Sequence, residues 1–447
     1  MSGAVLIRGV ALALVPDANG ALRPDDSRHD LLIEEGVVAR IAPANRLDGD
    51  GVTLVDGDAL VALRGFTDLY GRLREPGPPG RGTLASETRA ALAGGFTRVL
   101  CAPDTDPVLD DTATLELIRR RAAEEPAARV LPMAALTRGL EGGELAPLAT
   151  LGKLGAVAAG QADRALEDAS VLRSAMQYAA TFDMPLVMTP RDAHLGADGC
   201  AHEGAVATRL GLPGIPVAAE TAALARLLEL ARDSGCRLHV SRLSSARGVE
   251  LVAEAKRSGL ALTADVGIHH LFFTESEIDG FDARYRSAVP FRSAADREAL
   301  RDGVRSGTID AICSDHAPLD GDARLAPFPA CAAGLAAYDH FLPLLLALPA
   351  LLDLPPSQLL ERVTDGPSRV LGLDTPESAG APVEGMTADL ILVDSGAGAR
   401  TPLSAGRNTP LDGVGNLAEC GLEPAPLTGA VRLAFVAGEP RLDTRRE

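Results

Sequence analysis

The chain has 447 residues, a net charge of −18 at pH 7 and a pI near 4.9. This acidic balance argues against nucleic acid or an anionic membrane surface as a partner. The hydrophobic fraction of 46% is ordinary for a globular protein. The longest apolar run, "FLPLLLALPALLDL" (341–354), is too short and too interrupted by proline to span a bilayer. We therefore expect a cytoplasmic protein with no membrane contact.

The two ends of the chain differ in pattern from its middle. Residues 1–60 and 376–447 contain short β-rich runs separated by Asp, Gly and Pro turns, and we expect them to fold together as a small β-sandwich. Residues 61–375 alternate strand and helix patterns, and eight strands in this order predict a (β/α)8 barrel. The candidate strands are 66–73, 97–102, 129–136, 156–159, 185–189, 237–243, 261–267 and 309–314.

The six cysteines form no CxxC pair and no regular framework, which favours buried free thiols in a reducing compartment. Cys200 and His202 have the spacing of a metal pair. Without a third ligand we interpret them as structural.

Several runs of sequence resemble, in the same order, the dihydroorotases and related cyclic amidohydrolases. They are "RGFTDLYGRLREPG" (64–77), "ETRAALAGGFTRVLCAPDTDPVLD" (87–110), "HEGAVATRLGLPGIPVAAET" (202–221), "SRLSSARGVELVAEAKRSGLALTADV" (241–266), "GTIDAICSDHAP" (307–318) and "NTPLDG" (408–413). The resemblance covers nearly the whole chain and implies a TIM barrel with a composite β-sandwich.

The resemblance also implies where the zinc ligands of that family would lie. The positions are Tyr70 and Arg72 for a histidine pair, Gln161 for a bridging acidic group, Thr189 and Arg242 for two further histidines, and Asp315 for the aspartate that binds metal and acts as general base. Only the last residue is retained. Because a guanidinium is cationic and repels a divalent metal, we expect no zinc and no other cofactor. Lys153 and Lys256 are the only lysines, so a carboxylated lysine has almost no candidate.

The substrate positions implied by the resemblance are altered as well. Arg74 stands where the family's arginine contacts the substrate carboxylate. Asp104 and Ala288 replace two asparagines, and Leu319 replaces a histidine. The loss of ligands and substrate contacts together argues against the same reaction with a relocated metal.

Asp315 has two interpretations. It could be a working general base, or a buried carboxylate neutralised by Arg72 or Arg242. A buried charge needs a partner, so we favour the second and expect Arg72 to be that partner. His316 is expected to be structural, because adjacent residues on a strand point to opposite faces.

Three functions follow, and the sequence favours the first. The chain resembles the inactive pseudo-dihydroorotase subunits of some bacteria, which form a mixed oligomer with the catalytic chain of aspartate transcarbamoylase. That resemblance implies a structural or regulatory role in pyrimidine biosynthesis, with self-association. The alternatives are an active cyclic amidohydrolase with a metal-poor site based on Asp315, and a sensor that binds a carboxylate ligand through Arg74.

Overall fold

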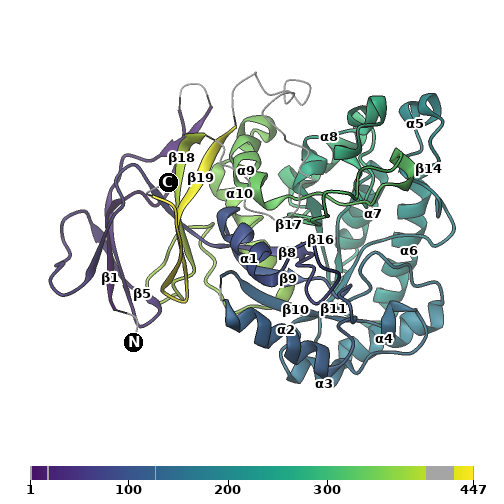
Figure 1. Cartoon of the computed structure of the whole chain (residues 1–447), viewed down its shortest axis with the longest axis horizontal. Helices are drawn as coiled ribbons and strands as arrows, with labels where there is room; N and C mark the ends of the chain where they lie inside the picture. Colours follow the sequence, from purple (N-terminus) through teal and green to yellow (C-terminus); the bar gives the residue numbers. More distant parts are fainter. Residues whose placement is uncertain (1–2, 18–19, 126, 399–426, 446–447) are drawn as a thin grey trace.

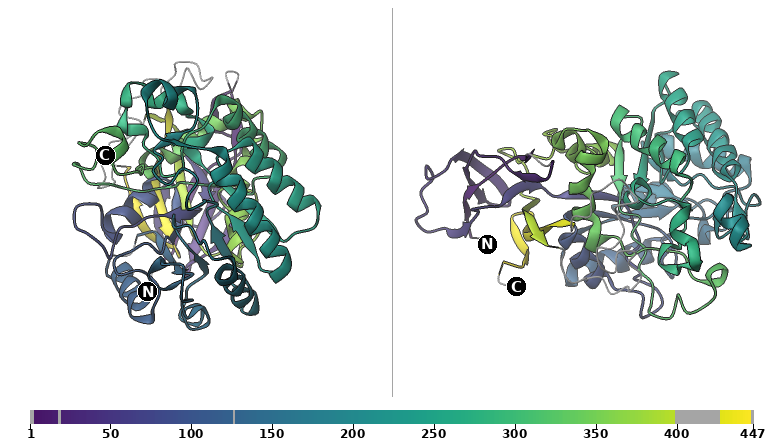
Figure 2. Two further views of the ribbon diagram at one scale, coloured as in Figure 1. Left: turned by 90° about the vertical axis from the view of Figure 1, so that its right-hand side faces the viewer. Right: turned by 90° about the horizontal axis from the view of Figure 1, so that it is seen from above.

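Eight parallel strands and a β-sandwich form the two parts of the molecule (Figure 1). The computed structural model describes residues 3–17, 20–125, 127–398 and 427–445. Cys420 and the motif at 408–413 lie outside the described residues. Seen from above, the sandwich lies at one end of the long axis and the barrel at the other (Figure 2).

The barrel strands follow the chain in order, and each pairs in parallel with the next. They are β8 (Phe66–Gly71), β9 (Phe96–Cys101), β10 (Arg129–Ala135), β11 (Ala158–Gly160), β12 (Leu186–Met188), β15 (Leu238–Val240), β16 (Leu262–Gly267) and β17 (Ala311–Cys313). The last strand meets the first through a parallel bridge between Gly71 and His316, where the Arg72 amide donates to the His316 carbonyl at 2.9 Å. The predicted (β/α)8 barrel is confirmed.

Helices separate most of these strands. Polar caps mark several helix starts: Thr83 forms a capping box with Ser86, and the Ser245 hydroxyl accepts from the Gly248 amide. The α-helices are α1 (Leu84–Ala93), α2 (Thr112–Glu124), α3 (Leu148–Lys153), α4 (Ala169–Thr181), α5 (Ala205–Leu210), α6 (Val217–Ser234), α7 (Ala246–Arg257), α8 (Ala294–Ser306), α9 (Tyr338–Leu352), α10 (Pro356–Glu361) and α11 (Asp365–Leu371).

The predicted strands are all present, with ends that differ slightly. The largest difference is at 237–243, where the strand is only Leu238–Val240. It ends early because Arg242 has a φ of +59°, which a strand cannot accommodate. The side chain of this residue therefore belongs to a loop at the mouth of the barrel.

The sandwich joins both ends of the chain, as expected. One sheet contains β1 (Val5–Val10), β4 (His29–Glu34), β5 (Val37–Pro43) and β6 (Thr53–Asp56). The other contains β7 (Val61–Arg64), β18 (Leu390–Gly398), β19 (Thr428–Val436) and β20 (Glu439–Asp443). Their inner faces share one apolar core, with Ile7 and Leu31 from the first sheet and Leu392 and Phe435 from the second. Since β7 pairs with β18, residues 61–64 lie in the sandwich and the barrel starts at Phe66.

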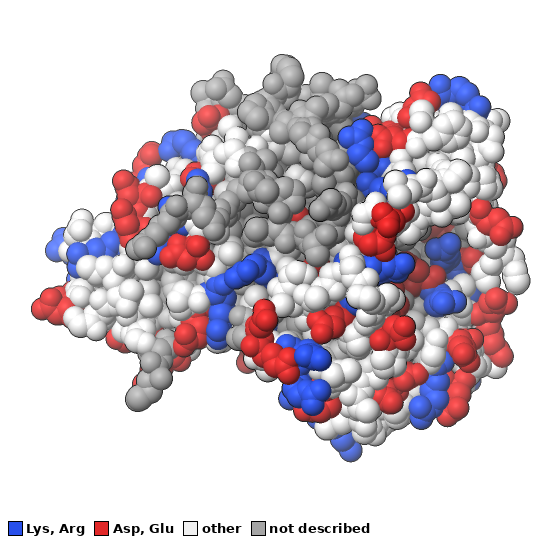
Figure 3. Space-filling view, in the orientation of Figure 1, with Lys and Arg blue, Asp and Glu red and all other residues white. Residues whose placement is uncertain are grey.

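Helix α9 and the residue Asp389 both connect the barrel to the sandwich. Helix α9 is buried along most of its length and packs between α1 and β19. Over the described residues, no helix is both long and apolar enough to cross a membrane. On the face drawn in Figure 3, acidic and basic side chains are interspersed across the described surface.

Asp389 is buried between the barrel and the sandwich. Its carboxylate accepts from Arg98 of β9 at 2.8 Å, from Arg129 of β10 at 2.7 Å and from the Ala437 amide of the sandwich at 2.8 Å. One side chain therefore holds three segments that are far apart in sequence.

We predict that Asp389→Ala lowers the free energy of unfolding by about 2–3 kcal/mol, because it leaves the Arg98 guanidinium without its counter-charge. Urea unfolding followed by circular dichroism measures the change. Glu377→Ala, which removes the exposed Arg369 pair, is the control and should stay within about 1 kcal/mol of the wild type. Equal losses in the two variants would contradict the prediction.

Candidate functional site

The candidate site lies at the carboxyl ends of the barrel strands, where the loops of a (β/α)8 barrel bring side chains together. Tyr70 is the last residue but one of β8, and Arg72 follows that strand directly. Asp163, Thr189, Arg242 and Asp315 follow β11, β12, β15 and β17 within three residues. Strand ends between residues 70 and 315 thus contribute to one cluster.

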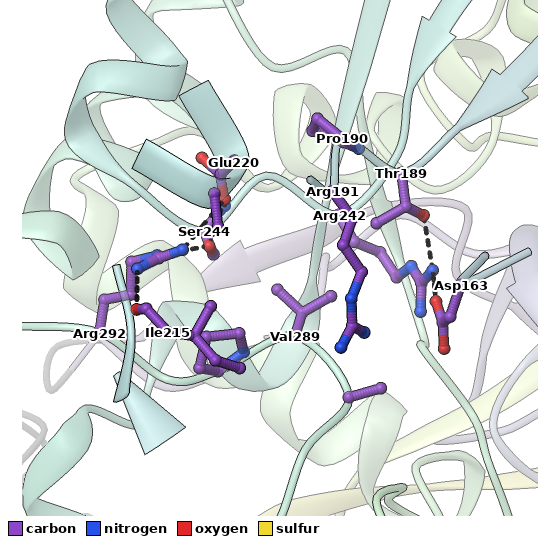
Figure 4. Close-up of a pocket in the computed structure, with 13 residues that line it drawn as sticks. Asp163, Thr189, Pro190, Arg191, Ile215, Glu220, Arg242, Ser244, Val289 and Arg292 are labelled. Carbon is purple, nitrogen blue, oxygen red and sulfur yellow. Dashed lines mark hydrogen bonds and ion pairs between the residues drawn. The ribbon is translucent and has the colours of Figure 1, made fainter. Parts of the chain in front are cut away.

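Arg242 lies at the centre of this cluster, with none of its side chain exposed. Its Nη1 donates to Asp315 Oδ1 at 2.8 Å, and its Nη2 donates to Asp163 Oδ1 and to Thr189 Oγ1 at 2.6 Å. The guanidinium also lies 3.6 Å from the centre of the Tyr70 ring, at cation–π distance. Figure 4 shows Arg242 between Thr189 and Asp163.

Arg72 forms the second half of the cluster. Its Nε donates to Asp104 Oδ2 at 2.7 Å, and its Nη2 donates to Asp163 Oδ2 and to the Tyr70 hydroxyl. Asp163 therefore bridges the two guanidinium groups, one on each carboxylate oxygen. We call these residues the arginine–aspartate network: Arg72, Arg242, Asp104, Asp163 and Asp315.

The two arginines of the network act on the protonation of Asp163. Burial alone would raise the pKa of Asp163, but the guanidinium groups of Arg242 and Arg72 outweigh it and hold the pKa below its usual range. Burial raises the pKa of Tyr70, so its hydroxyl stays protonated. Each carboxylate of the network is ion-paired with at least one guanidinium group.

One sequence prediction is wrong here, and one residue was missed. Arg72 is not the partner of Asp315; Arg242 is, because Arg72 is held by Asp104 and Asp163 instead. The interpretation of Asp315 as a carboxylate neutralised by one of the two arginines matches the geometry. Gln161, expected in the site, bonds with the Thr137 hydroxyl at 2.8 Å.

Asp163 takes the central position that the prediction gave to Gln161. Ala162 has a φ of +51°, and the chain turns there so that the side chain two residues after Gln161 reaches the two arginines. The available signal was an acidic residue in the loop at the carboxyl end of a barrel strand, where functional side chains of this fold gather.

The predicted substrate positions surround a cavity of about 270 Å³ in front of the network. Arg74, Asp104, Ala288 and Leu319 all line it. Asp104 does not project a free charge into it, because Arg72 holds its carboxylate. Arg74 donates through Nε to the Pro318 carbonyl at 2.9 Å, which leaves its two Nη groups for other contacts.

Local backbone geometry at the site is unusual. Arg74, Ala162, Arg242 and Asp315 have φ between +51° and +61°, a region that costs a non-glycine residue about 1–2 kcal/mol. Gly71 is required where it stands, since a Cβ there would lie 2.4 Å from the Tyr338 hydroxyl. Strain of this kind concentrates at functional sites and is maintained by the surrounding structure.

Three of the buried histidines bond to other side chains of the fold. His316 is structural, as predicted: its Nε2 bonds to Glu87 at 2.8 Å, and its ring stacks on Tyr338. His239 bonds to Asp265 at 3.0 Å, and His202 lies 3.2 Å from an Arg292 nitrogen. In the part of the chain that the structure describes, no three His, Cys, Asp or Glu side chains are grouped to hold a metal ion. The five described cysteines are buried free thiols.

We predict that Asp315→Ala lowers the free energy of unfolding by about 3–5 kcal/mol, because the buried Arg242 loses one of its two counter-charges. The shift of the urea midpoint measures it. The matched control is Asp320→Ala, which breaks an exposed pair with Arg81 and should cost about 0–1 kcal/mol. A loss for Asp315→Ala no larger than that of the control would contradict a structural role.

A second prediction concerns acid stability. His269 is buried with neither ring nitrogen bonded within the described structure, and burial lowers its pKa to about 3. The unfolded chain takes up this proton near pH 6.5 and the folded chain does not. This histidine's contribution is therefore complete above pH 6.5 and falls by about 1.4 kcal/mol per pH unit below it.

We expect His269→Phe, which keeps a ring beside Phe273, to flatten the dependence of stability on pH between 6.5 and 4.5. Urea midpoints at several pH values measure the slope. His194→Gln, at a side chain that is 83% exposed, is the control and should keep the wild-type slope. An unchanged slope for His269→Phe would contradict the prediction, because the imidazole would then take up its proton at the same pH in the folded and the unfolded chain.

Comparison with known proteins agrees with the barrel and its composite sandwich. A family model described as dihydro-orotase-like matches residues 59–247. The dihydroorotase-like proteins of Pseudomonas aeruginosa and Pseudomonas putida are 44% and 43% identical over 418 residues, which are 92% of this chain and 95% and 94% of theirs. A dihydroorotase of Anaeromyxobacter sp. (strain K) is 39% identical over 395 residues, 87% of this chain and 90% of its own.

Solved structures with the same fold are more distant in sequence. An L-hydantoinase (dihydropyrimidinase) from Arthrobacter aurescens matches 98% of this chain and 96% of its own with a TM-score of 0.80 at 20% identity. A D-hydantoinase from Thermus sp. matches 98% and 95% with a TM-score of 0.77 at 18% identity. At these identities the likeness concerns the fold alone, whereas the relatives above share two fifths of their residues over most of the chain. The protein belongs to the dihydroorotase-like family of amidohydrolases.

Proposed function

We propose that this chain is a catalytically inactive dihydroorotase homologue and serves as a structural or regulatory subunit of aspartate transcarbamoylase in pyrimidine biosynthesis. The observation that carries the proposal is the arginine–aspartate network. Two guanidinium groups occupy ligand positions of the family's metal centre and satisfy the carboxylates that remain there.

The residues at the centre do not suit zinc. Zinc in a hydrolytic site is held by imidazole nitrogens and carboxylates that converge at about 2 Å. Here Tyr70, Arg72, Thr189 and Arg242 offer one phenol, one hydroxyl and two cations. The carboxylates of Asp104 and Asp163 are bonded to Arg72, and that of Asp315 is bonded to Arg242. The proposed structural role does not require a metal ion.

Asp315 is also a poor general base in this arrangement. Its Oδ1 is occupied by the hydrogen bond from Arg242, whose side chain has no exposed surface. An active cyclic amidohydrolase with a metal-poor site would need this group free. The geometry therefore favours the inactive homologue over that alternative.

The proposed partner rests on resemblance. The motifs "SETRAALAGG" (86–95), "ALTRGLEGGELAPL" (135–148), "YAATFDMPLV" (178–187) and "LSSARGVELV" (243–252) resemble those of pseudo-dihydroorotase subunits that assemble with aspartate transcarbamoylase. The two Pseudomonas relatives are named dihydroorotase-like rather than dihydroorotase. A barrel whose strand ends are joined by ion pairs between its own side chains can serve as a structural subunit without a cofactor.

The test measures metal, activity and assembly on one sample. We expect the purified chain to contain far less than one zinc per chain and to show no interconversion of carbamoyl aspartate and dihydroorotate, while a relative named dihydroorotase, prepared in the same way, provides the positive control. We expect size-exclusion chromatography with the aspartate transcarbamoylase chain to give one larger species. Stoichiometric zinc with turnover would overturn the inactive assignment, and separate elution of the two chains would overturn the partner.

A further inference from the structure

A groove lies at the amino ends of the barrel strands, at the opposite end of the barrel from the arginine–aspartate network. Ala156 lies just before β11, Pro185 directly precedes β12 and Arg237 directly precedes β15, and all three residues line the groove. Its volume is about 420 Å³. None of its lining residues belongs to the cavities at the mouth, so the groove is separate from the candidate site.

Two helices end beside this groove, each with a large apolar side chain in the C-cap position. Helices α3 and α4 lie side by side (Figure 1). Leu154 caps α3 and is 41% exposed, and Phe182 caps α4 and is 47% exposed. Phe182 lines the groove, and Leu154 directly follows Lys153, which also lines it. Large apolar side chains that gather at an open groove indicate a surface that binds another protein.

The Phe182 ring is fixed by its neighbours. It packs edge-to-face on Tyr178 of α4, with the ring centres 5.5 Å apart and an angle of 82° between the planes. The Tyr178 hydroxyl in turn accepts from the Ala149 amide of α3 at 3.3 Å. A side chain that is already ordered loses little entropy on association, so Phe182 is well suited to the centre of an interface.

The groove also carries one cation and one anion that have few contacts of their own. The Lys153 ammonium makes no hydrogen bond or ion pair within the described part of the chain. The Asp183 side chain is 80% exposed, and its Oδ2 meets Arg237 at 3.3 Å, which leaves Oδ1 available. Both residues line the groove beside Phe182. The same surface therefore offers a positive and a negative group to a partner.

A surface of this kind is complementary to itself. In a contact with two-fold symmetry, the same patch of both copies meets, so that residue i contacts residue j and j contacts i. With the axis beside Phe182, the lysine of each copy can face the aspartate of the other. Because each chain has a net charge of −18, two copies repel each other at long range and need attractive charges where they touch. The presence of both signs favours a second copy over a partner of one charge sign.

We propose that two copies of this chain associate through the groove, with Phe182 at the centre and Lys153 of each copy paired with Asp183 of the other. An apolar centre with charged groups at its edge is the usual arrangement of protein interfaces. The contact requires neither a ligand nor the transcarbamoylase, so it stands or falls independently of the proposed function.

Sedimentation velocity of the purified full-length chain over a range of micromolar concentrations tests the surface. We expect the wild type to form a dimer with twice the mass of the 46.2 kDa chain. Phe182→Ser should raise the dissociation constant of the dimer at least about tenfold, because it removes the apolar centre. The matched control is Leu54→Ser, at a side chain of β6 in the sandwich that is 52% exposed, and it should dimerise as the wild type does. Thermal unfolding checks that each variant is folded.

Exchange of charges tests the pairing. Lys153→Glu and Asp183→Lys each place like charges opposite one another at two points, so each variant alone should dissociate at least about tenfold more readily. An equimolar mixture of the two variants should recover dimers, because every contact then joins opposite charges. Arg40→Glu, at an exposed arginine of β5 in the sandwich, makes the same change of charge as Lys153→Glu and should leave the dimer intact.

Recovery of dimers in the mixture supports the proposed contact, since only charges that face each other across an interface behave in this way. A wild type that stays monomeric at every concentration overturns it. So does a Phe182→Ser variant that dimerises like the wild type, or a mixture that stays dissociated. Variants that dimerise normally but no longer bind the transcarbamoylase would assign the groove to that chain and overturn its assignment to a second copy.

Discussion

The guanidinium of Arg242 has no exposed surface, and the arrangement of the barrel mouth follows from the need to neutralise it. A cation in that position is tolerated only if several acceptors surround it. Asp163, Asp315 and Thr189 supply them, and the Tyr70 ring covers one face. Because these groups come from four strands, satisfying one charge also fixes the relative positions of the strand ends.

Asp163 extends the same constraint to a second arginine. Its two oxygens each accept from a different guanidinium, so Arg72 and Arg242 are held at one carboxylate although both are positive. The arrangement has a parallel in binuclear metal centres, where an acidic group bridges two cations. Here the two cations are the side chains of Arg72 and Arg242, so no metal ion has to bind. The positive φ values of Arg242 and Asp315 show that the backbone bears strain to place these two side chains face to face.

The sequence allowed the fold and most of the cluster to be predicted. Alternation of strands and helices predicts a barrel, and the resemblance to the dihydroorotases implies that Tyr70, Arg72, Thr189 and Arg242 share one site with Asp315. The pairing within the cluster could not be read in this way. It depends on the turn at Ala162, which brings Asp163 rather than Gln161 to the centre and leaves Arg72 no longer available to Asp315. The positive φ of Ala162 therefore determines the pairing of both Asp163 and Arg72, and it leaves no periodic pattern in the sequence.

The network and the cavity in front of it divide the arginines into two groups with different consequences. Arg72 and Arg242 are each ion-paired with two carboxylates, so they contribute to the stability of the barrel and offer little to a ligand. Arg74, Arg191 and Arg286 border the same space without carboxylate partners in the described structure, so their charges are directed at whatever enters it.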